Sequence, residues 1–223
     1  MKNTALLIEL IQHLDAYESK QSNDHSTSLN DFTGYLNSLG GEGPSPMRKI
    51  EGDKETGSQK EKRTAPNNIS ILLVLMYRYV RIYIKKALKE GPIQTADEFS
   101  FLITLMTYES MTKTELICNQ VMEKTSGTEI IKRLLKQGLV REFADPDDKR
   151  SVRVAITGKG RQALSTTFPG MNMVAKIVLG DLSSPEIKTL YYLLKKLDFY
   201  HNDIFHHKRG RSLEELSEEY SFG

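Results

Sequence analysis

The chain has 223 residues, of which 39% are hydrophobic, and its 31 Lys and Arg almost balance its 29 Asp and Glu, leaving a net charge of +2. This balance excludes a uniformly basic nucleic-acid-binding protein, so such a function depends on where positive charge is concentrated. One cysteine excludes an intrachain disulfide framework and is typical of a reducing compartment. The longest apolar run, Ile71–Met76, is too short to cross a bilayer, so we expect a cytoplasmic protein.

Two short amphipathic helices are predicted at the N-terminus. Leucine and isoleucine recur at helical spacing over residues 3–19, and apolar residues do so again over residues 29–39. The first stretch is interrupted by Glu9 and Asp15 and is followed by no small-residue cleavage site, which favours an amphipathic helix over a signal peptide. We expect residues 1–40 to form a helical hairpin, called the N-terminal arm below.

A long helix is predicted after a flexible linker. The linker, residues 41–67, is rich in Gly, Pro and charged residues and almost free of large apolar ones. The helix covers residues 68–89, about six turns, and ends in basic residues before Gly91–Pro92. Its first half is apolar on almost all sides, so it is either the central core helix of a monomer or partly buried by a second subunit.

Three short helices are predicted in the middle of the chain. Thr95 and Thr112 each precede a Glu by three residues, the spacing of a capping box, and are expected to begin the first two helices. The third is expected to begin with a cap at Thr125 or Ser126 and to end at Gly138. Short helices joined so closely indicate a helix-turn-helix.

Two short strands and two long helices follow. Strands are predicted over residues 139–143 and 151–156, on either side of the turn ADPDDKR. A long helix is expected after Thr157, and a second one begins at a Ser with Pro185 in its first turn. The polar tail, residues 208–223, is expected to have no stable structure.

Helix-turn-helix, strand, turn, strand and helix is the order of a winged helix. Three motifs make it more specific: Leu-x-x-x-Gly-Leu-Val at the end of the third short helix, Asp-x-x-Asp-x-Arg in the turn, and Ile-Thr followed by a Gly at the next helix start. In this chain they are Leu134–Val140, Asp145, Asp148 and Arg150, and Ile156, Thr157 and Gly160. With these motifs, the chain resembles the MarR family of transcriptional regulators over about residues 69–205.

The resemblance implies a mainly α fold with a small β-wing. It places a winged helix-turn-helix domain at residues 95–156 and a helical dimerisation region at residues 68–94 and 157–207. The N-terminal arm has no counterpart in the family core. It can pack on the dimerisation helices, dock on the partner subunit, cover an effector cavity or recruit another protein.

The resemblance also implies binding to double-stranded DNA, with the third short helix in the major groove and the wing in the minor groove. Arg150 is expected to enter the minor groove, because its guanidinium is planar and weakly hydrated. We expect Asp148 to orient Arg150, and Lys149 and Arg153 to contact phosphates. The alternative for this turn is a solvated polar hairpin without a partner.

The recognition helix offers further candidate contacts. Ser126 and Thr128 have hydroxyls that reach base edges or phosphates, and Gly127 allows close backbone approach. Glu129 either accepts a hydrogen bond from cytosine or, as an acid at a helix start, interacts with the helix dipole. Residues 111–163 hold eleven Lys/Arg and seven Asp/Glu, a net of +4, against −2 for the first 66 residues. The cations expected to contact DNA here are Lys113, Lys132, Arg133 and Lys136.

A homodimer and a site for a small anionic or phenolic effector are further implications of the resemblance. Tyr77, Arg81 and Tyr108 are candidates to line the site, although plain packing also explains such side chains. Cys118, the only thiol, is expected to be a packed core residue and not a redox sensor. We expect no metal and no other cofactor. Near the end of the last long helix lies a cluster of possible metal ligands: His201, Asp203, His206 and His207. We interpret this cluster as an exposed helix end, with a metal site as the alternative.

These observations predict a homodimeric bacterial DNA-binding regulator, a repressor that binds a pseudo-palindromic operator and has no membrane partner. The alternative is a winged helix protein-interaction module that does not bind DNA. An enzyme is not expected, because no Ser/His/Asp, Cys/His or phosphate-loop arrangement is present and the carboxylates fall in turns or helix caps.

Overall fold

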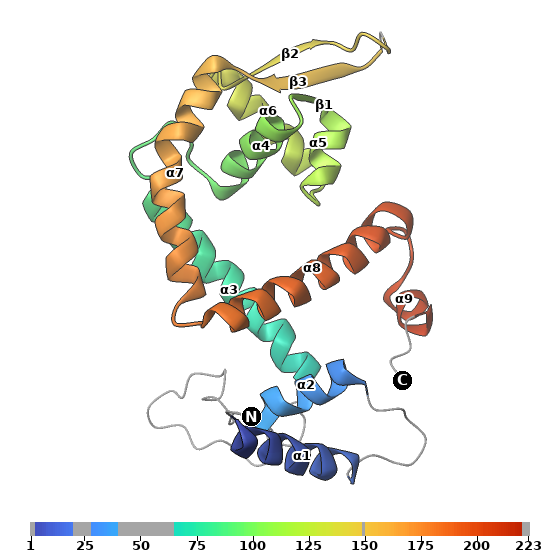
Figure 1. Cartoon of the computed structure of the whole chain (residues 1–223). Helices are drawn as coiled ribbons and strands as arrows, with labels where there is room; N and C mark the ends of the chain where they lie inside the picture. Colours follow the sequence, from blue (N-terminus) through green and yellow to red (C-terminus); the bar gives the residue numbers. More distant parts are fainter. Residues whose placement is uncertain (1–2, 20–27, 40–64, 149, 220–223) are drawn as a thin grey trace, which may run out of the picture. The chain divides into compact units, whose positions relative to one another are not determined.

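The computed structural model describes residues 3–19, 28–39, 65–148 and 150–219 (Figure 1). Its contacts divide the chain into two compact units, Met1–Leu72 and Leu73–Gly223. Most of the predicted linker and Lys149 of the wing lie outside the described residues. No helix in the described ranges is long and apolar enough to cross a membrane.

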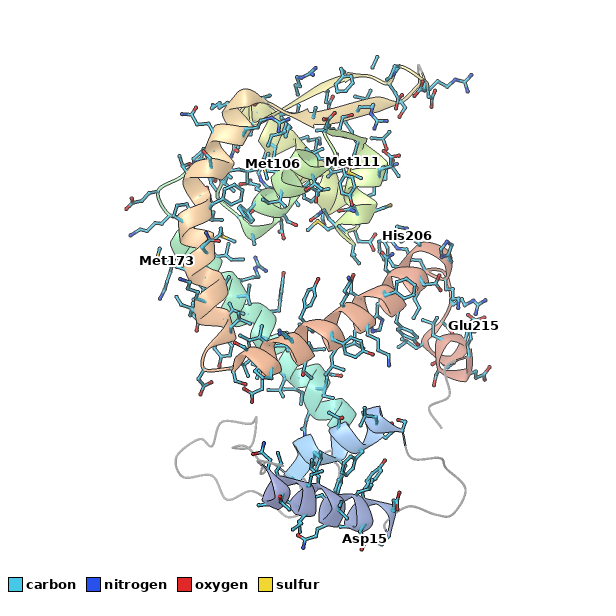
Figure 2. The ribbon with its side chains drawn as sticks, viewed as in Figure 1. Asp15, Met106, Met111, Met173, His206 and Glu215 are labelled. Atoms are coloured by element: carbon cyan, nitrogen blue, oxygen red, sulfur yellow. The ribbon has the colours of Figure 1, made fainter. Side chains whose placement is uncertain are left out.

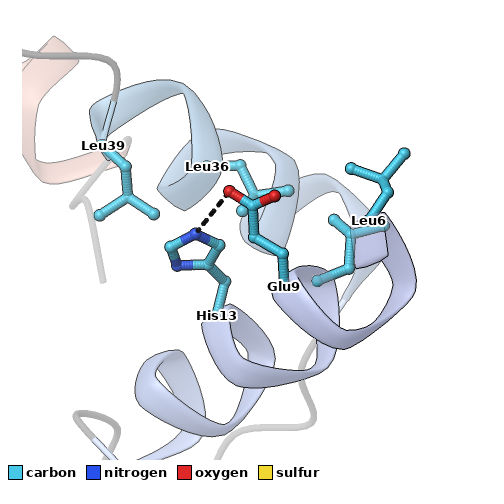
Figure 3. Close-up of a pocket in the computed structure, with 6 residues that line it drawn as sticks. Leu6, Glu9, His13, Leu36 and Leu39 are labelled. Atoms are coloured by element: carbon cyan, nitrogen blue, oxygen red, sulfur yellow. Dashed lines mark ion pairs between the residues drawn. The ribbon is translucent and has the colours of Figure 1, made fainter. Parts of the chain in front are cut away.

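The first unit contains the two helices predicted for the N-terminal arm. They are α1 (Thr4–Glu18) and α2 (Leu29–Leu39), and they pack against each other. Near the end of α1, the ring of Tyr17 lies 5.9 Å from that of Phe32 and 5.0 Å from that of Tyr35. The two helices also share a groove of about 400 Å³ (Figure 3), which is lined by Leu6, Glu9, Leu10, His13, Leu36 and Leu39.

Helices and strands in the rest of the chain follow the predicted order, with two additions. The helices before the wing are α3 (Ala65–Ala87), α4 (Ala96–Thr107), α5 (Lys113–Asn119) and α6 (Lys124–Lys136). The strands are β1 (Ser110–Thr112), β2 (Val140–Ala144) and β3 (Val152–Ile156). They form an antiparallel sheet in the order β1-β3-β2, so the predicted β2–β3 hairpin gains a short edge strand. This mainly helical fold with a small sheet confirms the expected fold class.

Helix starts in this region are set by side-chain caps. Thr112 and Glu115 form the predicted capping box at α5. Thr112 is also the last residue of β1, so that strand and helix meet without an intervening loop. Thr95 accepts a hydrogen bond from the Glu98 backbone N–H, at 3.1 Å, as expected for α4. The predicted cap of α6 at Thr125 or Ser126 is wrong, because the helix begins at Lys124, with Glu123 at the cap position and no side-chain cap bond.

The hydrophobic core of this region draws on every element around the sheet. Fully buried side chains come from four helices, from β3, and from the segments just before α4 and just before β2. Examples are Ile93, Phe101, Leu116, Ile131, Leu134, Leu139, Val154 and Leu164. Met111 of β1 packs against this core, whereas Met173, on the long helix after the wing, is 61% exposed (Figure 2). The core therefore fixes α6 and the β2–β3 hairpin on one scaffold.

Three helices complete the chain: α7 (Gly158–Leu179), α8 (Ser184–His207) and α9 (Leu213–Glu219). Ser183 and Glu186 cap α8, which has no buried residue along its 24 residues. The helix α9 is the second addition to the prediction. Its start is capped by Ser212 and Glu215, so the expectation of a tail without stable structure is wrong for residues 213–219.

Candidate nucleic-acid interface

The recognition helix α6 has one buried side and one exposed side. Ile130, Ile131 and Leu134 face the core. The opposite side exposes residues spaced three or four apart, as expected for one face of a helix: Ser126, Glu129, Lys132, Arg133 and Lys136. Five of the predicted contact residues are therefore brought together on one surface.

Gly127 lies on the buried side of α6, which corrects its predicted role. A Cβ added to it would stand 2.5 Å from Cγ1 of Ile117. Only a residue without a side chain fits where α6 crosses α5 this closely. Gly127 thus serves the packing of the helix-turn-helix and not the approach of a partner. Thr128 is half-buried, and its hydroxyl donates to the carbonyl of Lys124 at 2.6 Å.

The cations of α6 differ in how firmly they are held. Lys132 pairs with Glu129 at 2.7 Å, and both side chains are more than half exposed, so this ion pair is weak and easily exchanged. Arg133 donates from Nε to Oε1 of Glu98 on α4, at 2.9 Å. Lys136, by contrast, has no partner among the residues that the structure describes. Among these three cations, only Arg133 is paired with a buried carboxylate.

The wing is braced at its base by a buried acid and an arginine. Asp145 is only 7% exposed and accepts hydrogen bonds from the Asp147 backbone N–H and from Nη1 of Arg153, each at 3.0 Å. The Asp147 N–H, with Arg153 second, holds the pKa of the Asp145 carboxyl below its ordinary value. Arg153 also donates to the hydroxyl and carbonyl of Ser110 in β1, at 3.1 and 2.9 Å.

These bonds give Arg153 a structural role that was not predicted, whereas its contact with phosphate stays a prediction. Its guanidinium is engaged inside the protein, where it joins the wing turn to the edge strand β1. The bonds between Arg153 and Ser110 could not be predicted from the sequence, because the two residues are 43 positions apart and β1 was not predicted.

The wing tip presents Arg150. Asp148 accepts a hydrogen bond from the Arg150 backbone N–H at 2.9 Å, so Asp148 shapes the turn through the backbone and not, as predicted, through the guanidinium. Arg150 is exposed, and its guanidinium has no partner among the described residues. Lys149, predicted beside it, lies outside those residues. The tip therefore offers a free arginine on a turn closed by hydrogen bonds.

Other cations flank the hairpin. Lys113, at the start of α5, pairs with Glu142 of β2 at 2.7 Å. Arg141 of β2 is exposed, and its guanidinium stacks over the ring of Phe143 at 4.9 Å. Arg141 was not among the predicted contacts, although its position in the strand that leads into the wing makes it a candidate.

The predicted effector, redox and metal residues are placed as follows. The guanidinium of Arg81 lies 5.6 Å from the centre of the Tyr77 ring, both on α3 and exposed, and Tyr108 at the end of α4 is 59% exposed. The thiol of Cys118 is free, and the residue is half-buried on α5. His207 bonds to Asp203 at 3.0 Å. Within the described ranges, no group of three or more His, Cys, Asp or Glu is arranged to hold a metal ion.

Comparison with known proteins decides the family. The model of the MarR family matches residues 95–152, from α4 to the wing. The multiple antibiotic resistance protein MarR of Salmonella typhimurium is 30% identical over 105 residues, which cover 46% of this chain and 72% of that protein. This chain belongs to the MarR family. It is therefore a winged helix protein of a family of DNA-binding transcription regulators.

Solved MarR-family structures have the same fold. A mutant MarR from E. coli complexed with operator DNA superposes with a TM-score of 0.54 at 24% identity, covering 60% of this chain and 99% of that chain. The structure of BpsR from Bordetella bronchiseptica, whose DNA binding is regulated by 6-hydroxynicotinic acid, gives a TM-score of 0.54 at 24% identity, covering 58% and 98%. The family match lies outside the N-terminal arm of this MarR-family chain.

Proposed function

We propose that this protein is a homodimeric transcriptional repressor. It binds a pseudo-palindromic operator with α6 in the major groove and Arg150 in the minor groove. The observation that carries the proposal is the exposed face of α6, with Ser126, Lys132 and Lys136, on the same core as a wing whose arginine has no described partner. The net charge of +4 over residues 111–163 supports it, because positive charge concentrates on these elements.

Two helices supply apolar surface for a dimer. In α3, eight large apolar residues between Ile69 and Ile82 are 39–57% exposed. In α8, Tyr191 is 66% and Phe199 81% exposed, and leucines of the same helix are exposed as well. Exposed apolar area on this scale marks an interaction surface, and each Å² removed from water contributes about 25 cal/mol. A second copy would cover it and place two recognition helices about one DNA turn apart.

The effector is proposed to be a small anionic or phenolic molecule. BpsR, which shares the fold, is regulated by an acid of this kind. Tyr77 and Arg81 supply an aromatic ring and a cation four residues apart on α3, a combination that suits an aromatic carboxylate. Tyr108 is the third residue proposed to line the site.

The test is fluorescence anisotropy with DNA from upstream of the protein's own coding sequence, across a salt series, and random DNA of equal length as the control. Tighter binding to the upstream DNA, with a steep negative slope of log K against log salt, supports the proposal. Equal and weak binding to both, with and without aromatic acids, contradicts it.

A protein-interaction module is the second candidate. It is favoured by the pairing of Lys113, Lys132 and Arg153 with carboxylates, which leaves fewer cations for DNA. The same titration separates the two functions. A module without DNA binding gives no salt-dependent signal with any duplex.

A further inference from the structure

Glu98 is a buried carboxylate whose two oxygens both have partners. It is 0% exposed, in the first turn of α4. One oxygen, Oε2, accepts from the Gln94 backbone N–H at 2.8 Å, and the other, Oε1, accepts from Nε of Arg133 at 2.9 Å. A buried carboxylate is costly unless it is paired and hydrogen-bonded, so this site holds the arginine in one place.

Only the Nε side of the Arg133 guanidinium is hydrogen-bonded to Glu98. The Glu98 side chain is 1% exposed, whereas the Arg133 side chain is 46% exposed. Guanidinium has five N–H donors, and only the one on Nε is used. The terminal nitrogens Nη1 and Nη2 have no partner among the described residues and belong to the same exposed face of α6 as Lys132 and Lys136. The outer end of the fork is thus free to bind an anion.

We propose that Glu98 is a positioning residue that presents Arg133 to a DNA backbone phosphate. The inference rests on the proposed function and adds a residue that contacts no DNA. Because Glu98 orders the guanidinium before DNA arrives, binding loses less side-chain freedom than it does at Lys132 or Lys136. Through the Gln94 N–H, Glu98 also connects this phosphate contact to the segment between α3 and α4.

The experiment measures affinity and salt slope of the full-length protein on its upstream duplex, for Glu98→Gln, Arg133→Ala and the double variant. Arg133→Ala removes one phosphate contact from each subunit of the proposed dimer, so it is expected to weaken binding by about tenfold or more and to make the slope shallower by about 1.8, the share of two phosphates. Glu98→Gln is expected to weaken binding about fivefold, the effect of leaving one flexible side chain unordered in each subunit. In the Arg133→Ala background, Glu98→Gln should change the affinity no further.

Whether Glu98→Gln weakens or strengthens DNA binding distinguishes a positioning role of Glu98 from an effect of its negative charge on the DNA. Loss of a carboxylate near DNA strengthens binding if only net charge matters, as expected for the control Glu142→Gln, whose side chain is 30% exposed and pairs with Lys113. Equal or tighter binding of Glu98→Gln, or the same loss in both backgrounds, overturns the inference.

A further variant guards against misfolding at the buried site. Arg133→Lys keeps the positive charge but has no Nε–H to dock on Glu98, so it should bind more weakly than the wild type. Equal affinity overturns the inference even if Glu98→Gln does not fold.

If the wild type itself does not prefer its upstream DNA, the proposed function fails and this inference fails with it. If the wild type binds specifically and Arg133→Ala leaves the affinity and slope unchanged, only the inference fails.

Discussion

Gly160 provides a sharp test of how α7 is fixed to the sheet. A Cβ added to it would lie 2.2 Å from the carbonyl oxygen of Leu139 and 2.7 Å from Cγ1 of Ile156. The Leu139 carbonyl cannot move away freely, because it accepts from the backbone N–H and the hydroxyl of Thr157, at 3.0 and 3.1 Å. The close contact is therefore with a backbone carbonyl that two hydrogen bonds from Thr157 hold in place.

The expected magnitude is a balance of two opposing effects. Replacing a helical glycine by alanine gains up to about 1 kcal/mol from helix propensity. Overpacking a well-packed site costs about 1–3 kcal/mol, and contact with backbone belongs at the upper end. Gly160→Ala should then lower the free energy of unfolding by about 2 kcal/mol. Gly158 is the matched control in the same helix, since an added Cβ there would meet nothing within 4 Å.

The assay is urea unfolding followed by far-ultraviolet circular dichroism, at one fixed protein concentration because the stability of the proposed homodimer depends on it. Gly160→Ala should unfold at clearly lower urea than the wild type, and Gly158→Ala at equal or slightly higher urea. A Gly160→Ala midpoint at or above the wild-type value would refute the reasoning about close packing. So would an equal loss in Gly158→Ala.

Three further outcomes are expected. Arg150→Ala should weaken operator binding about tenfold without changing the sedimentation of the dimer, and unchanged affinity would remove Arg150 from the mechanism. Deletion of residues 1–66 should leave a folded dimer in size-exclusion chromatography, and aggregation or monomers would show that the arm is structural. Because the pKa of Asp145 is lowered in the fold, its contribution to stability is present above its unfolded pKa of about 3.9 and is lost as the pH falls through the folded value. Acid titration of unfolding should therefore show a smaller loss of stability below about pH 4 in Asp145→Asn than in the wild type.

Regular elements with a strong local signal were predictable from sequence. The capping box of Thr112 and Glu115 and the exposed face of α6 follow from spacing alone, because helix periodicity places residues three and four apart on one side. The wing turn was recognisable because Asp, Pro and Asp at fixed offsets favour a reversal. Arg150 was singled out by the resemblance to the MarR family and not by the turn residues themselves.

Contacts between residues distant in sequence were not predictable. Glu98 has the spacing of a capping acid, yet its carboxylate bonds to Gln94 and to Arg133, 35 residues away. Gly127 has the composition of a flexible helix start, and only the position of Ile117 shows that it is a packing residue. The strand β1 has three residues, which is too short for an alternating pattern to identify.

The junction at Thr112 has a consequence for the DNA. This residue pairs with Arg153 in the sheet and at the same time caps α5, so the wing and the helix-turn-helix share a residue. Neither can tilt against the other without breaking the strand pairing or the cap. On the proposed operator, each subunit therefore keeps a fixed distance between α6 in the major groove and the wing in the neighbouring minor groove. We expect a duplex that deforms easily to match this distance at lower cost, so base pairs that no side chain contacts should still affect affinity through their stiffness.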